Sequence, residues 1–90
     1  MSSNSSIDQL EQGDFCELDA RGLLCPEPVM LLHNAVRGMD SGDIVRVLAT
    51  DPSSARDIAR FCEFLGHLLL HSKAEEQGDE TVLMFWIQRK

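Results

Sequence analysis

The sequence has few basic residues for its size. Eight Lys and Arg stand against 15 Asp and Glu, which gives a formal net charge of −7 at pH 7. Tight nucleic-acid binding depends largely on Lys and Arg that neutralise phosphates, and the basic residues here form no cluster along the chain. The composition therefore argues against direct nucleic-acid binding and favours a protein partner.

The chain also lacks a long apolar segment. The longest uninterrupted apolar run covers residues 82–87, whereas a membrane-spanning helix needs about 20 apolar residues. Residues 1–6 lack the basic and then apolar pattern of a secretory signal. We therefore expect a cytoplasmic protein with no membrane association.

Cysteine is scarce and unpaired in its spacing. Cys16, Cys25 and Cys62 form no C-x-x-C pair, a reducing compartment disfavours structural disulfides, and the spacing does not fit a structural zinc site. His67 and His71 belong to a predicted strand, where they would lie about 13 Å apart, too far to share one ion. We expect no metal site.

The length allows one domain. Residues 1–14 are rich in Ser, Asn, Gln and acidic residues, so we interpret them as a flexible tail. Residues 15–90 form the single predicted domain. Apolar periodicity places strands at 15–20, 44–49, 67–76 and 81–88, with a hairpin turn at 77–80.

Two helices are predicted between these strands. The first is expected to begin at Cys25-Pro26, because proline is favoured at the first helical position. The second is expected to begin at Asp51-Pro52 with Asp51 as N-cap, and to end at Gly66. The order β-α-β-α-β-β predicts an α+β fold: a two-layer α/β sandwich in which a four-stranded mixed sheet has both helices on one face.

Helical spacing also predicts which residues are buried. The inward stripe of the first helix comprises Val29, Leu32, Val36 and Met39. The inward stripe of the second comprises Ala55, Ile58, Ala59, Cys62 and Leu65. Cys62 is therefore expected in the core, and Cys16 is expected to be buried on its strand. Phe64 falls off the stripe, and an exposed aromatic side chain often marks a contact site.

Cys25 is the candidate reactive residue. At the N-cap of the first helix, the partial positive charge of the helix terminus would favour a thiolate. Cysteine is a poor N-cap compared with Ser, Asn or Asp, so its presence at this position indicates a role beyond capping. The carboxylate of Glu27 would raise the thiol pKa, so we expect only modest activation. Position alone leaves open whether Cys25 only caps the helix.

Two stretches carry a family resemblance. Residues 18–30 read LDARGLLCPEPVM, and residues 51–58 read DPSSARDI. Together they resemble the TusA, or SirA-like, family of sulfur carriers over residues 16–90. The resemblance implies a two-layer α/β fold and a persulfide formed on Cys25. The donor it implies is a pyridoxal-phosphate cysteine desulfurase, and a sulfur-relay protein is the implied acceptor.

The resemblance leaves the pathway open. We favour a sulfurtransferase acting in tRNA 2-thiouridine formation, and the alternatives are sulfur delivery to molybdenum cofactor or sulfur-oxidation pathways. A thiol redox protein and a non-catalytic regulatory interaction module are the other function classes. The carrier is expected to be a monomer without a cofactor. Residues expected to contribute to partner docking are Glu27, Met30, Arg37, Asp51, Arg56 and Phe64. His33 and Asn34 stand where some relatives carry a basic pair.

Overall fold

The computed structural model describes residues 15–90, and the flexible tail predicted at 1–14 lies outside the described residues. The described chain follows the predicted order of strands and helices. The elements are β1 (Cys16–Ala20), α2 (Glu27–Arg37), β2 (Ile44–Ala49), α3 (Ser54–Leu65), β3 (Leu68–Gln77) and β4 (Glu80–Gln88).

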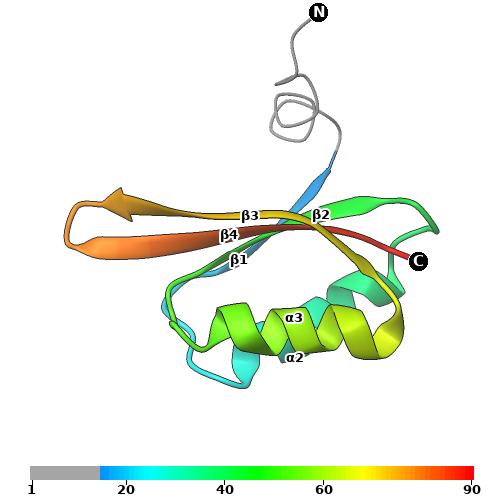
Figure 1. Cartoon of the computed structure of the whole chain (residues 1–90), viewed down its shortest axis with the longest axis horizontal. Helices are drawn as coiled ribbons and strands as arrows, with labels where there is room; N and C mark the ends of the chain where they lie inside the picture. The colour runs from blue at the N-terminus through cyan, green and yellow to red at the C-terminus, as the bar shows by residue number, and fades with distance from the viewer. Residues whose placement is uncertain (1–14) are drawn as a thin grey trace, which may run out of the picture.

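The four strands form one mixed sheet in the order β1-β2-β4-β3. β1 and β2 are parallel, and β4 is antiparallel to both β2 and β3. Both helices cover the same face of this sheet (Figure 1). The predicted α+β, two-layer fold is therefore confirmed. α2 and α3 have 11 and 12 residues, and neither is long and apolar enough to cross a membrane.

The main core lies between the helices and the sheet. Leu32 and Val36 of α2 belong to one buried cluster with Ile58, Phe61 and Cys62 of α3. The sheet contributes Val45, Val47, Ala49, Phe85 and Ile87 to the same cluster. The α2 stripe is as predicted except that Val29 is only partly buried.

The predicted stripe of α3 needs a correction. Ala55 and Ala59 are exposed, whereas Ser54 and Phe61 are buried. The large Phe61 side chain packs in the core between α3 and the sheet. The buried face of α3 is therefore rotated from the predicted one, and the two alanines lie outside it. Burial of Cys62 is confirmed.

The opposite face of the sheet carries a second apolar cluster of Leu48, Val82, Met84 and Trp86. Cys16 is exposed, so the prediction that it is buried was wrong. Cys16 is the first residue of β1, an edge strand that pairs only with β2, so the sheet leaves this end of the strand uncovered.

Candidate functional site

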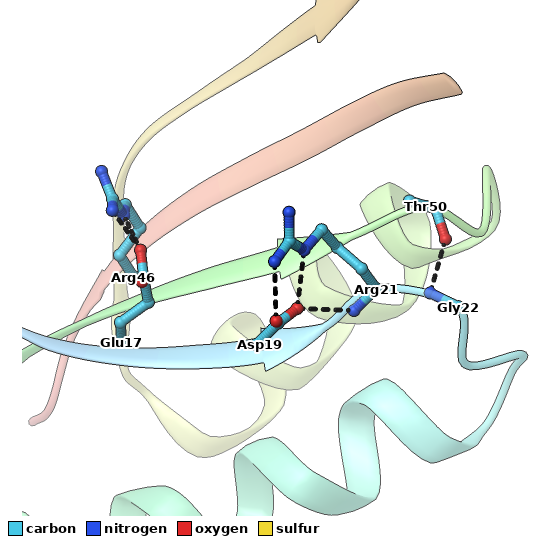
Figure 2. A network of polar contacts seen from close by, with 6 residues as sticks. All are labelled: Glu17, Asp19, Arg21, Gly22, Arg46 and Thr50. Carbon is cyan, nitrogen blue, oxygen red and sulfur yellow. Dashed lines mark hydrogen bonds and ion pairs between the residues drawn. The ribbon is translucent and has the colours of Figure 1, made fainter. Parts of the chain in front are cut away.

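Two loops meet at one edge of the sheet. β1 and β2 are parallel neighbours, and their last residues, Ala20 and Ala49, are in register. The loop 21–26 and the loop 50–53 therefore leave the sheet side by side. The backbone N–H of Gly22 donates to Thr50 Oγ1 at 2.8 Å and joins the two loops (Figure 2).

The start of the loop 21–26 is held by an ion pair. The Arg21 backbone N–H and guanidinium both donate to the Asp19 carboxylate, with the closest contact at 2.8 Å (Figure 2). Hydrogen bonds from Arg21 lower the pKa of Asp19 to about 2. Gly22 has a φ of +82°, a conformation that favours glycine. Glu17 and Arg46 form a further ion pair that joins β1 to β2.

Two carboxylates hold Cys25 in place, one from the loop 50–53 and one from α3. Its backbone N–H donates to Asp51 Oδ2 at 2.7 Å. Its thiol donates from Sγ to Asp57 Oδ2 at 2.9 Å. Asp51 lies in the loop 50–53, and Asp57 lies in the first turn of α3. Cys25 itself is exposed, so a partner can reach the sulfur.

The helix starts differ from the predicted ones. α2 begins at Glu27 with Pro26 at the N-cap, after a cis Cys25-Pro26 peptide bond, so Cys25 precedes the cap. The Glu27 N–H donates to the Leu24 carbonyl at 2.9 Å and thus does not serve the thiol. The N-cap prediction for Cys25 was wrong because the proline turn delays the helix.

Asp51 is not an N-cap either. α3 begins at Ser54 with Ser53 at the N-cap, and Pro52 precedes the helix. The Asp51 carboxylate instead accepts from the Ser53 N–H and hydroxyl, both at 3.0 Å, while it also holds the Cys25 N–H. These hydrogen bonds, the one from Cys25 first, lower the pKa of Asp51. Asp51 thus links the two loops.

The surroundings of Cys25 favour the thiol over the thiolate. The hydrogen bond to Asp57 is the largest cause that raises the thiol pKa, followed by desolvation and the negative charge of Asp57. A weaker effect of Ser53 lowers this pKa, and the charge of Asp51 raises it. The expectation of an anion-favouring helix terminus was therefore wrong, and the acid responsible is Asp57 rather than Glu27.

An apolar cleft opens beside the thiol between α2 and α3. Its volume is about 390 Å³, and its lining residues are Cys25, Pro26, Val29, His33, Asp57, Arg60, Phe61, Phe64 and Leu65. The His33 ring meets the edge of Phe61 with centroids 4.7 Å apart. Phe64 is 86% exposed at the cleft. A side chain of a partner protein could therefore enter next to Cys25.

The predicted docking residues do not all lie at this cleft. Asp51 contacts Cys25, Phe64 lines the cleft, and Arg56 donates to Asp57 Oδ1 at 3.4 Å. Glu27 and Met30 line a smaller hollow of about 190 Å³ together with Leu23, Leu31 and Asn34. Arg37 is exposed in the last turn of α2.

Asp57 was missed as a site residue by the sequence reasoning. It lies 32 residues from Cys25 in the chain, and its only sequence signal is an acidic residue in the first turn of a helix. Over residues 15–90, no group of three or more His, Cys, Asp or Glu side chains is arranged to hold a metal ion. The arrangement instead presents one exposed sulfur at the mouth of an apolar cleft.

The comparisons with known proteins identify the family. The family model described as "Sulfurtransferase TusA" matches residues 16–89. The chain belongs to this family. A sulfur carrier protein TusA of Pseudomonas syringae pv. syringae is 53% identical over 74 residues, which cover 82% of this chain and 83% of that protein. A sulfur carrier protein TusA of Pseudomonas putida (strain F1) is 52% identical over 73 residues, covering 81% and 86%.

A solved structure supports the TusA fold. The crystal structure of a SirA-like protein from Desulfitobacterium hafniense superposes with a TM-score of 0.63. It is 22% identical in sequence and covers 84% of this chain and all of its own. Membership of this family gives the chain a role as a sulfur carrier in sulfur transfer.

Proposed function

We propose that this protein accepts a sulfane sulfur from a cysteine desulfurase as a persulfide on Cys25. It then passes the sulfur to a sulfur-relay acceptor protein, as a cytoplasmic monomer, for tRNA 2-thiouridine formation. The observation that carries this proposal is the exposed Cys25 at the apolar cleft of a TusA-family protein.

The transfer requires only thiol exchange. In the first step the Cys25 sulfur attacks the outer sulfur of the donor persulfide, and a new S–S bond forms on Cys25. The donor S–S bond breaks, and the donor cysteine leaves as a thiolate that takes the proton lost by Cys25. In the second step the acceptor thiolate attacks the outer sulfur on Cys25 and forms a new S–S bond, while the S–S bond on Cys25 breaks and Cys25 leaves as a thiolate that takes up a proton. Neither step needs an oxidant, and rates depend on thiolate fraction, leaving group and access.

The other two cysteines are poorly suited to this exchange. Cys62 is 3% exposed, and desolvation raises its pKa to about 11. Cys16 is exposed but lies at the start of β1, at the far end of that strand from the loop 21–26. Cys25 alone combines exposure with the cleft.

The cleft supports a role for Phe64 in partner docking. An exposed aromatic side chain beside the reactive sulfur provides apolar contact area for a partner. Asp51 and Arg56 act on the same site through Cys25 and Asp57. Glu27, Met30 and Arg37 extend the docking surface along the exposed side of α2.

Incubation with a cysteine desulfurase and cysteine, followed by mass spectrometry, tests the proposal. We expect a gain of about 32 Da on Cys25, the mass of one persulfide sulfur. Cys25→Ser should keep the fold and lose both the gain and the delivery of labelled sulfur, because a hydroxyl cannot hold a sulfane sulfur. Cys16→Ser is the matched control and should load normally. Delivery by Cys25→Ser, or only intermolecular disulfides in the native protein, would contradict the proposal.

A further inference from the structure

The Asp57 carboxylate is divided between two partners. Oδ2 accepts from Cys25 Sγ at 2.9 Å, and Oδ1 accepts from Arg56 Nε at 3.4 Å. The contact with Cys25 requires a hydrogen on the sulfur, because two anions in this position would repel each other. The geometry therefore describes the empty carrier with a neutral thiol.

We propose that Asp57 is a positioning residue whose contact with Cys25 depends on the sulfur load. Its carboxylate holds the thiol hydrogen of the empty carrier, and it repels the persulfide anion of the loaded carrier away from its own side of the cleft between α2 and α3. This inference rests on the proposed function of Cys25.

The chemistry of loading explains the change. The empty carrier and a donor persulfide, R–S–SH, give Cys25–S–SH and R–SH, so one S–S bond forms, one breaks, and the protons balance. A persulfide S–H is more acidic than a thiol S–H, so the loaded group then releases its proton to water at neutral pH. The charge-assisted hydrogen bond to Asp57 is lost, and like-charge repulsion replaces it.

The charged groups around Cys25 favour movement of a persulfide anion away from Asp57. Asp57 contacts the thiol, and Asp51 contacts the backbone of the same residue. The cleft, which Asp57 also lines, presents Arg60 from α3 and the His33 ring from α2. A persulfide anion is therefore repelled by the two carboxylates that hold the empty residue and is attracted by the Arg60 guanidinium.

Two further groups complete the electrostatic surroundings. Arg56 pairs with Asp57 and offsets its negative charge. The Ser53 hydroxyl donates to Asp51 and has a weaker effect that lowers the pKa of the Cys25 thiol. Glu27 follows two residues after Cys25 but lines the other hollow of α2. Removal of the Asp57 charge therefore acts on the group that touches the sulfur, and the remaining charges stay in place.

The test compares Asp57→Asn with Glu63→Gln, both in a Cys16→Ser background that leaves Cys25 as the exposed thiol of the described chain. Glu63 is an exposed acid on the same helix, so its variant removes the same charge at a position outside the cleft lining. Iodoacetamide reacts with the ionised sulfur, and its rate is measured against pH. The carrier is measured empty and after chemical loading of Cys25 with inorganic polysulfide.

In the empty carrier, Asp57→Asn should raise the alkylation rate at pH 7.5 by at least about threefold and move the midpoint to lower pH, since the thiolate is no longer opposed by the carboxylate. Glu63→Gln should change the rate by less than about twofold because an exposed, distant charge is screened. In the loaded carrier, the terminal sulfur is already ionised and makes no hydrogen bond to Asp57. Asp57→Asn should therefore change the alkylation rate by less than about twofold.

Three results would overturn the inference: an unchanged midpoint in Asp57→Asn, an equal effect of Glu63→Gln, or the same rate change in both load states. An equal rate change in both load states would mean that the substitution only disturbs the loop 21–26, which carries Cys25. Asp57→Ala should reproduce the acceleration, and urea unfolding checks that each variant folds. The empty-carrier measurement needs no desulfurase, so its failure is distinct from a failure of Cys25 to accept sulfur from the enzyme.

Discussion

Cys62→Ser tests whether the buried cysteine has only a packing role. Cys62 is 3% exposed within the core cluster that joins α3 to the sheet. Serine has a similar shape but places a hydroxyl among apolar side chains, and an unpaired buried hydroxyl costs about 1–3 kcal/mol. The cost falls toward the lower end if the new hydroxyl donates to the Ile58 carbonyl one turn earlier. Domains of this kind have a total stability of about 5–15 kcal/mol.

Urea unfolding followed by tryptophan fluorescence measures this loss. The chain has one tryptophan, Trp86, which is fully buried in the sheet, so its emission reports on unfolding. A loss of about 1–3 kcal/mol corresponds to a lowering of Tm by roughly 4–8 °C for each kcal/mol. Sulfur loading of the folded variant should equal that of the native protein, because Cys62 does not reach the cleft.

The matched control is Cys16→Ser. The thiol of Cys16 is exposed at an edge strand, and exposed substitutions of this kind change stability by less than about 0.5 kcal/mol. Equal stability of the Cys62→Ser and Cys16→Ser variants would refute the assigned burial of Cys62. Loss of loading in folded Cys62→Ser would refute the assignment of sulfur transfer to Cys25 alone.

Two further predictions concern the loop that carries Cys25. NMR titration should give the Asp19 carboxyl a midpoint at about pH 2. Because its pKa is lowered only in the folded state, its contribution to stability should be present above pH 3.8 and lost as pH falls through about 2. Arg21→Gln should return the midpoint toward 3.8, and an unchanged midpoint would contradict the ion pair. Gly22→Ala should cost about 1 kcal/mol in urea unfolding, since φ is +82° and no atom lies within 4 Å of the added Cβ. Gly38→Ala, at a φ of −91°, is its control, and an equal cost at both glycines would contradict the assigned backbone strain.

The fold was largely predictable because its signals are local. Alternation and helical spacing fix the element order, and the short chain allows only two layers. Helix starts were less predictable, because Pro26 and Pro52 are each compatible with a helix start but lie before the first helical residue in the structure. The side chain of Asp51 serves the neighbouring loop instead of a cap, and that contact depends on the parallel pairing of β1 with β2.

Cys25 was chosen as the candidate reactive residue from its position and its family resemblance, and its reactivity stays a prediction. Its electrostatic partner was not predicted, and the expected thiolate-favouring environment was wrong. The helix terminus that was expected to favour a thiolate begins one residue later than predicted, so Pro26 and not Cys25 is its N-cap. The dominant charge comes from Asp57, 32 residues away in the chain.

The position of Asp57 is linked to which face of α3 is buried, and that face includes Phe61. Each helical residue turns by about 100°. The centre of the predicted stripe (Ala55, Ile58, Ala59, Cys62 and Leu65) therefore differs by about 50° from the centre of the observed one (Ser54, Ile58, Phe61 and Cys62). With the predicted stripe inward, Asp57 would point to solvent on the far side of the helix. With Phe61 buried, Asp57 lies on the flank of α3 and contacts Cys25. The packing of α3 on the core thus places a carboxylate next to the candidate reactive sulfur.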